Sequence, residues 1–137
     1  MKDSQVFDCT LVKLAKNHSD RGNITAVTQE KQVPFSIERV YYLYDVPGGE
    51  ARGGHAHRNL QQLVVAASGS FDLIIDDGCV RRTFHLSRPY VGVYLPSGIW
   101  REIDNFSSGS ICLVLASLPY DERDYIRDYN EFVQWKL

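Results

Sequence analysis

The feature of this sequence that most constrains its fold is the close spacing of its turn signals. Clusters of Gly, Pro, Asn, Asp and Ser recur along the chain and leave only short segments between them. These segments are rich in β-branched and aromatic residues, and several alternate apolar with polar positions, as half-buried strands do. Many short strands separated by frequent turns predict an all-β sandwich or barrel.

The most sharply defined hairpin lies in the middle of the chain. Residues 71–76 alternate apolar with polar positions, and residues 80–86 are predicted to return as the partner strand. Between them stands Asp77-Gly78, a dipeptide favoured in tight hairpin turns because Gly accepts a positive φ. Similar patterns predict further strands over residues 6–14, 24–28, 36–46, 60–67, 90–95, 100–106 and 110–117.

Three expectations concern the C-terminal third. Residues 100–106 and 110–117 are predicted to pair with each other around Ser107-Ser108-Gly109. Residues 111–116 are apolar at every position, so we expect one face in the core and the other against a second subunit or another layer. Apolar side chains in residues 120–135 recur at three- and four-residue spacing, which predicts a C-terminal helix.

Composition narrows the class of protein. The length of 137 residues predicts one domain over residues 1–137, large enough to fold without a metal or disulfide. The net charge of -2 provides no basic excess for nucleic-acid binding. No apolar run approaches the roughly 20 residues that span a bilayer, and no signal peptide is visible. With three cysteines and no CxxC pair, we expect a cytoplasmic protein with reduced thiols and no membrane partner.

The strongest local signal for chemistry is His55-Ala56-His57. In a strand, residues two apart point to the same face, so both imidazoles would enter one cavity. Gly53 and Gly54 directly before the pair allow close backbone packing. The pair can supply two metal ligands, or a general base with a binding partner, or it can have no functional role.

Two stretches around this pair resemble the motifs of the cupin family. The first is residues 49–69 with His55, His57 and Gln62; the second is Pro96-x-Gly98-x-x-Arg101-x-x-x-Asn105. Metal-binding cupins carry two His and a Glu in the first motif and one His in the second. Here Gln62 replaces the Glu and Arg101 replaces the last His, and neither is a suitable ligand. We therefore predict no metal and no other cofactor.

A narrower resemblance extends over nearly the whole chain. The sequence is similar to the sugar 3,4-ketoisomerases, which act on dTDP-4-keto-6-deoxyglucose on the way to dTDP-3-amino sugars. This resemblance implies a metal-free homodimeric cupin, a jelly-roll-like double-stranded β-helix with a short C-terminal helix. It also implies a place in the biosynthesis of surface glycans such as O-antigens or S-layer glycans. The segments that carry it are Asp20-Arg21-Gly22, Arg39-Val40-Tyr41-Tyr42, residues 47–57, Trp100-Arg101-Glu102, residues 105–108, residues 114–117 and residues 120–127.

The resemblance also implies roles for individual residues. His55 is expected to be the base that removes the C3 proton, a task that suits a group with a pKa near neutrality. Arg101 is expected to stabilise the enediolate in place of a metal, and Tyr41 to bind a sugar oxygen or carry a proton. Which of the alternating tyrosines at positions 41, 42 and 44 faces the cavity is open at this point. The expected substrate-binding residues are Arg21, Arg52, His57 and Asn105, with an orienting role toward His55 as the alternative for His57.

Two other functions remain as alternatives. A 3,5-epimerase of the rhamnose pathway would use the same substrate and a similar histidine base, although those chains are usually longer. A non-catalytic sugar-binding cupin would bind the nucleotide sugar without exchanging its protons with solvent. The concentration of His, Arg and Tyr in the predicted site favours the enzyme, because binding alone needs fewer polar groups.

Overall fold

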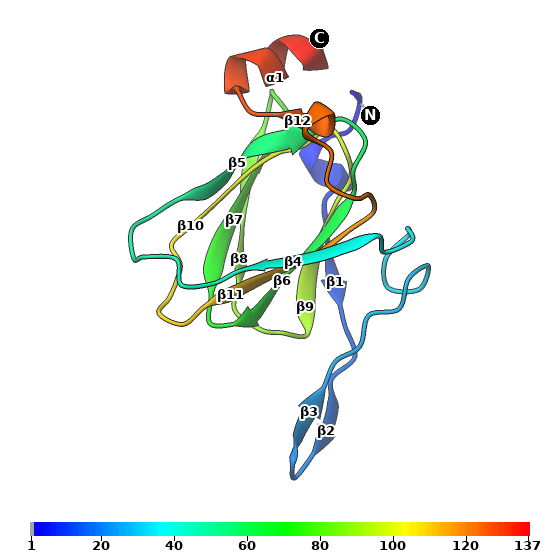
Figure 1. Cartoon of the computed structure of the whole chain (residues 1–137), viewed down its shortest axis with the longest axis vertical. Coiled ribbons are helices and arrows are strands. Elements are labelled where there is room, and N and C mark those ends of the chain that lie inside the picture. The colour runs from blue at the N-terminus through cyan, green and yellow to red at the C-terminus, as the bar shows by residue number, and fades with distance from the viewer. Residues whose placement is uncertain (1) are drawn as a thin grey trace.

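Two five-stranded antiparallel sheets packed face to face form the body of the protein (Figure 1). The computed structural model describes residues 2–137. The first sheet has the order β1 (Thr10–Lys13), β9 (Val91–Leu95), β6 (Gln62–Ser68), β11 (Ile111–Ala116) and β4 (Arg39–Leu43). The second has the order β12 (Tyr125–Ile126), β5 (Arg52–His57), β10 (Trp100–Asp104), β7 (Phe71–Asp76) and β8 (Arg81–Leu86). This arrangement confirms the predicted all-β jelly-roll of the cupin type, with two separate sheets in place of a closed barrel.

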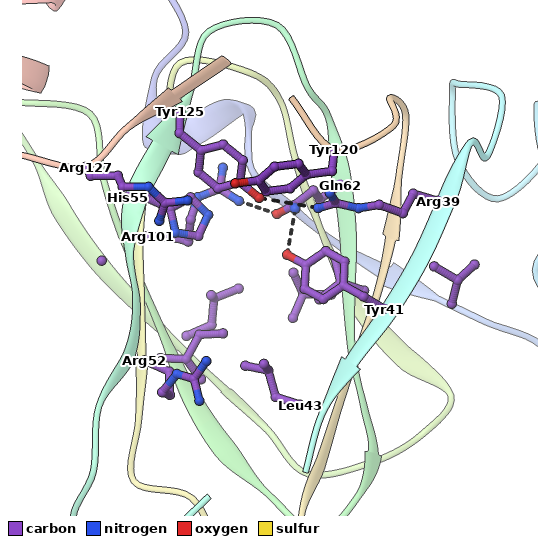
Figure 2. Close-up of a pocket in the computed structure, with 16 residues that line it drawn as sticks. Arg39, Tyr41, Leu43, Arg52, His55, Gln62, Arg101, Tyr120, Tyr125 and Arg127 are labelled. Atoms are coloured by element: carbon purple, nitrogen blue, oxygen red, sulfur yellow. Dashed lines mark hydrogen bonds between the residues drawn. The ribbon is translucent and has the colours of Figure 1, made fainter. Parts of the chain in front are cut away.

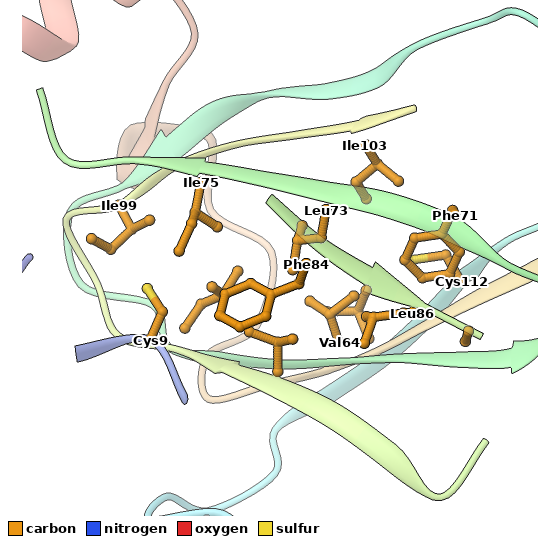
Figure 3. Close-up of a cluster of buried hydrophobic side chains, with 14 of the residues drawn as sticks. Cys9, Val64, Phe71, Leu73, Ile75, Phe84, Leu86, Ile99, Ile103 and Cys112 are labelled. Atoms are coloured by element: carbon orange, nitrogen blue, oxygen red, sulfur yellow. The ribbon is translucent and has the colours of Figure 1, made fainter. Parts of the chain in front are cut away.

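The core lies between the two sheets. Val64 and Val114 from the first sheet pack with Leu73 and Ile75 from the second, and all four are almost fully buried (Figure 3). Each fully buried side chain of this size contributes roughly 1.5–3 kcal/mol by leaving water. The inward positions recur at every second residue of their strands, so the alternation in the sequence determines which face each strand buries.

The outer face of the first sheet carries a layer made by the same chain. Val33 and Phe35, from the segment between β3 and β4, pack on Leu63 and Leu115. This contact explains why β11 is apolar on both faces, and it confirms the expected burial of the second face. Part of that covering layer is therefore intramolecular.

The hairpin predicted in the middle of the chain is confirmed. β7 and β8 pair from Phe71 opposite Leu86 to Asp76 opposite Arg81. The carboxylate of Asp77 accepts hydrogen bonds from the backbone of Cys79 and Val80, and Gly78 adopts a φ of 93°. A side chain at position 78 would be strained in that conformation, which explains the glycine.

One prediction about the C-terminal third is wrong, and the predicted C-terminal helix is confirmed but is shorter than expected. β10 and β11 do not pair with each other, because the turn after β10 crosses from the second sheet to the first. The predicted helix over residues 120–135 is divided into a 3-10 turn η2 (Glu122–Asp124), strand β12 and helix α1 (Tyr129–Lys136). Pairing of Tyr125 with His57 extends the chain, and Asp128 then caps α1 by accepting a bond from the backbone of Glu131.

The N-terminal region also differs from expectation. Residues 6–14 divide into a 3-10 turn η1 (Val6–Asp8) and β1, and the strand predicted at residues 24–28 ends at Ile24. A short hairpin of β2 (Asn17–Ser19) and β3 (Gly22–Ile24) projects away from the two sheets, with every residue exposed (Figure 1). Within residues 2–137 the helices are too short and too polar to cross a membrane.

Candidate active site

A cavity of about 530 Å³ opens between the two sheets. Strands β4, β5, β6, β10 and β12 each contribute side chains to it (Figure 2). Its floor is apolar and is formed by the core residues Val64, Leu73 and Val114. Its polar lining consists of Arg39, Tyr41, Arg52, His55, Gln62, Arg101, Tyr120, Tyr125 and Arg127.

The structure brings four of the seven predicted site residues into this cavity. His55 and Arg101 are direct partners in the antiparallel register of β5 and β10. Tyr41 enters from β4 of the opposite sheet, and Arg52 from the start of β5 (Figure 2). The alternation along β4 resolves the open question about its tyrosines, since Tyr42 and Tyr44 point outward and are mostly exposed.

Arg101 is buried and is held by neutral acceptors. Its Nε and Nη2 donate to the carbonyl oxygen of Ile99, at 3.3 and 3.1 Å. Its Nη1 donates to Oε1 of Gln62, and Nε2 of Gln62 donates to the hydroxyl of Tyr41 at 3.0 Å. Burial lowers the pKa of Arg101, yet a guanidinium stays charged in proteins. None of the ion pairs within residues 2–137 involves Arg101, so its positive charge remains available to an anionic ligand or intermediate.

His57 lies behind His55, outside the cavity lining. It is fully buried, and its Nδ1 lies 3.0 Å from Oδ2 of Asp124. Burial lowers the pKa of His57 to about 4, although the hydrogen bond to Asp124 acts in the opposite direction. The imidazole is therefore neutral near pH 7, with Nδ1 protonated and Nε2 as an acceptor that has no hydrogen-bond partner. This position fits orientation of His55 more closely than direct substrate contact.

The ring of His55 is packed between two other rings. It meets the ring of His57 edge-on at 4.8 Å between centroids, and the ring of Tyr125 at 5.0 Å. Tyr125 also contacts His57, at 4.4 Å. Because β12 pairs with β5, the aromatic ring of Tyr125 is placed directly beside both histidines. The orientation of His55 is thus fixed by packing on a strand, as a group engaged in proton transfer requires.

Two of the predicted substrate-binding residues lie away from the cavity of their own chain. Arg21 is exposed at the tip of the β2–β3 hairpin. Asn105 follows β10 with a φ of 53°, and its Nδ2 donates to Oδ2 of Asp72 at 3.1 Å on the surface. This bond accounts for Asn105 as a turn residue that ends β10.

The site also contains residues to which the sequence reasoning assigned no role. The Arg39 guanidinium lies over the rings of Tyr41 and Tyr120, at 4.7 and 5.5 Å from their centroids. The Arg127 guanidinium lies over Tyr125 at 4.2 Å and is paired with Glu122. Residues 120–127 belong to the segments that carry the family resemblance, but the helix prediction for this segment obscured their position beside the histidines.

The charged side chains that line the cavity are all positive among the described residues. Four arginines line the cavity, and among the described lining residues there is no Asp or Glu. Such a cavity attracts anions by its local field even though the net charge of the chain is -2. Within residues 2–137, no group of three or more His, Cys, Asp or Glu side chains is placed to hold a metal ion. The donor set thus fits an anionic organic ligand and does not fit a metal.

Fold and site together define a cupin-type protein with a cavity that is lined by arginines and by one histidine, His55. Residues 7–136 match the family model described as FdtA, WxcM-like, C-terminal, and the chain belongs to this family. It is 42% identical to the TDP-4-oxo-6-deoxy-alpha-D-glucose-3,4-oxoisomerase of Aneurinibacillus thermoaerophilus over 91% of this chain and 90% of that protein.

Solved structures give the same result. The WlaRB TDP-quinovose 3,4-ketoisomerase of Campylobacter jejuni is 43% identical, with a TM-score of 0.89 over 93% of this chain and 98% of the other. A mutant 3,4-ketoisomerase of Thermoanaerobacterium thermosaccharolyticum, solved in complex with TDP-4-keto-6-deoxyglucose, is 32% identical, with a TM-score of 0.92 over 95% and 94% of the two chains. The resemblance to sugar 3,4-ketoisomerases is therefore confirmed.

Proposed function

We propose that this chain is a sugar 3,4-ketoisomerase that converts dTDP-4-keto-6-deoxyglucose into the corresponding 3-keto sugar. The observation that carries the proposal is the direct pairing of His55 and Arg101 across β5 and β10 in one cavity. A base and a fixed cation on neighbouring strands are what an enediolate mechanism needs. The names of the relatives supply the nucleotide and the sugar.

The reaction moves one proton between carbons and one between oxygens. His55 removes the proton from C3, and the electrons of that C–H bond form a C3–C4 double bond as the C4 carbonyl oxygen gains negative charge. Arg101 stabilises this charge from a buried position, where it is only weakly screened. Tyr41 donates its hydroxyl proton to the C4 oxygen and receives the proton of the C3 hydroxyl. The electrons left on the C3 oxygen then form the C3 carbonyl as His55 returns its proton to C4.

The nucleotide part of the substrate would contact the arginines of the cavity lining other than Arg101. Arg39, Arg52 and Arg127 line the cavity from different sides, together with the exposed ring of Tyr120 (Figure 2). Guanidinium groups bind phosphate oxygens in a bidentate manner, and aromatic rings stack on a base. We therefore propose that these arginines bind the diphosphate; Asn105 is not part of the proposed site.

The proposed function is tested by incubation with dTDP-4-keto-6-deoxyglucose in deuterated water, followed by NMR. A new C3 ketone with deuterium at C4 of the product, or deuterium at C3 of the recovered substrate, supports the isomerase. Deuterium at C5 would instead identify a 3,5-epimerase. Binding of the sugar without any solvent exchange would identify a non-catalytic sugar-binding cupin.

We also propose a homodimer in which Arg21 enters the cavity of the partner subunit. The β2–β3 hairpin is exposed along its whole length, and Ile24 within it is 70% exposed. On the outer face of β4, Val40, Tyr42 and Tyr44 are also more than half exposed. Apolar side chains in such positions are typical of surfaces that a second subunit covers.

Co-expression of two variants distinguishes shared from self-contained sites. Arg21→Ala and His55→Asn would each be inactive alone. In a mixed dimer with shared sites, one site has both substitutions and the other has none, so about a quarter of the wild-type activity returns for random pairing. Self-contained sites would give no recovery, and this result would contradict the proposed role of Arg21.

The location and pathway remain proposals as well. Cys9 and Cys112 are buried free thiols, and burial raises the pKa of each to about 12, which makes them unreactive. Reduced cysteines agree with a cytoplasmic enzyme that supplies a keto sugar for amination at C3.

A further inference from the structure

The further inference concerns Gln62, which joins two of the proposed catalytic residues. Gln62 lies on β6, is 2% exposed, and contacts Arg101 with one end of its amide and Tyr41 with the other (Figure 2). In the proposed mechanism so far it has no role. Its position between a fixed cation and a phenol nevertheless imposes a direction on the hydrogen bonds.

The direction follows from the donor and acceptor inventory of the three side chains. A guanidinium can only donate, so the amide of Gln62 must present its oxygen to Arg101. The amide nitrogen then faces Tyr41 and donates to its hydroxyl oxygen at 3.0 Å. The phenol proton must therefore point elsewhere.

The remaining direction for that proton is the cavity. Tyr41 lines the cavity, and within residues 2–137 its hydroxyl has no hydrogen-bond partner other than Gln62. Burial raises the pKa of Tyr41, so the hydroxyl keeps its proton at neutral pH. The phenol is thus held as a donor toward a bound ligand, and the bond received from Gln62 strengthens it as a donor.

We infer that Gln62 is a positioning residue that, through Arg101, fixes Tyr41 as a hydrogen-bond donor toward the keto oxygen of the substrate. The inference rests on the proposed function, because it concerns the proton that moves between the C4 and C3 oxygens. When the hydroxyl of Tyr41 gives its proton to the C4 oxygen, the amide N–H of Gln62 stabilises the phenolate. The proton of the C3 hydroxyl then restores the phenol.

Two substitutions of Gln62 distinguish an effect on the direction of the Tyr41 O–H from a purely structural effect. Gln62→Glu keeps the shape and still satisfies Arg101, but its carboxylate accepts a hydrogen bond from the phenol O–H and so turns that O–H away from the substrate. Gln62→Met removes both bonds and leaves a guanidinium N–H of Arg101 unpaired. A purely structural role predicts that Met is the more harmful substitution, because the unpaired buried charge is costly.

The inference predicts the opposite order. Gln62→Glu is expected to lower kcat on the order of 100-fold, as loss of one oriented donor does, with KM changed by less than about threefold. Gln62→Met is expected to lower kcat by only about tenfold, since the phenol is free to rotate back toward the substrate. The matched control is Gln61→Glu, because Gln61 lies on the opposite face and its Oε1 accepts a bond from Tyr94, which a carboxylate retains.

A double variant makes the test independent of folding losses. In a Tyr41→Phe background there is no hydroxyl to orient, so adding Gln62→Met, which leaves the charge of Arg101 without an anionic partner, should change kcat by less than about twofold. If the fold-decreases in kcat of the two single variants multiply fully in the double variant, the inference is overturned. A Gln62→Glu enzyme with wild-type kcat would also overturn it. If Tyr41→Phe itself keeps wild-type kcat, the proposed role of Tyr41 fails and the inference fails with it. Gln62→Met carries this comparison, because Gln62→Glu would also neutralise Arg101.

Discussion

Nδ1 of His57 donates a hydrogen bond to Oδ2 of Asp124 across 3.0 Å, in surroundings from which water is almost excluded. The same carboxylate accepts bonds from the backbone of Asn59 and Leu60. Although burial alone would raise the pKa of Asp124, these bonds keep it below its ordinary value. An ionised Asp124 therefore selects one tautomer of His57, and the ring of His57 in turn supports the ring of His55.

Replacing Asp124 by Asn tests this selection. The variant can present its amide NH2 to His57 and so favour the other tautomer, and we expect kcat to fall by about 10- to 100-fold, as it does when an outer partner of a functional histidine is lost. NMR of ¹⁵N-labelled imidazoles should show the change at Nδ1 and Nε2 of His57. Asp121→Asn is the matched control, since Asp121 is in the same segment but pairs with exposed Arg123. An unchanged tautomer together with an unchanged kcat would contradict the prediction.

Replacing His55 by Asn should abolish exchange of the C3 proton while the fold is retained. The side chain lies at the cavity surface and not in the core, so the thermal unfolding midpoint should change little. Deuterium incorporation, followed by NMR, measures the proton transfer directly. His85→Asn is the control, because His85 is exposed on β8, away from the cavity, and its Nδ1 bonds Oδ1 of Asp72. Wild-type turnover by the His55 variant would remove His55 from the mechanism.

The stability of the fold should depend on pH through His57. Burial lowers its folded-state pKa from 6.5 to about 4, so the unfolded chain binds a proton in this window that the folded chain does not. The contribution is complete above pH 6.5 and is lost as the pH falls toward 4, with a total on the order of 3 kcal/mol. Urea unfolding between pH 7 and pH 4 measures it. A His57→Gln variant with the same pH slope as the wild type would assign the effect to other groups.

Chelation should leave the activity unchanged. Arg101 and Gln62 occupy the cavity positions where metal-binding cupins place ligands, and both are engaged in a hydrogen-bond chain that a cation would disrupt. We expect full activity after dialysis against EDTA and less than one metal ion per ten chains in elemental analysis, a threshold set at roughly a tenth of stoichiometric occupancy. Activity that disappears on chelation and returns with one added divalent ion would refute this expectation.

Local patterns predicted the parts of the fold that depend on neighbouring residues. The β7–β8 hairpin follows from the alternation of Phe71, Leu73 and Ile75 with Asp72 and Asp76 and from Asp77-Gly78. Both signals are contained within 16 residues of sequence, from Phe71 to Leu86. Residues 120–135 show the opposite case. The helical spacing of these residues correctly predicts α1. Tyr125 and Ile126, however, pair with residues of β5 that lie about 70 positions earlier in the sequence. Tertiary pairing there overrides local periodicity.

The residues of the site also fall into those that the sequence predicted and those whose placement depends on tertiary pairing. His55, Arg101 and Tyr41 were predicted by resemblance, and the structure brings them together in one cavity. Arg39 and Tyr125 were not assigned roles, because their placement depends on strand pairing that no spacing in the sequence reveals. Asp124 carries no local signal either, since a carboxylate in an acidic, turn-rich segment resembles any solvated side chain.

The pairing of β12 with β5 also sets an order in time for the synthesis of this protein. The histidines are at positions 55 and 57, whereas Asp124 and Tyr125, which fix their rings, are translated almost 70 residues later. A ribosome-bound chain can form much of both sheets before these residues emerge, and its histidines then remain unsupported. A chain cut before position 124 would retain most of the strands and lack a working site, so catalytic competence reports that translation has passed this point.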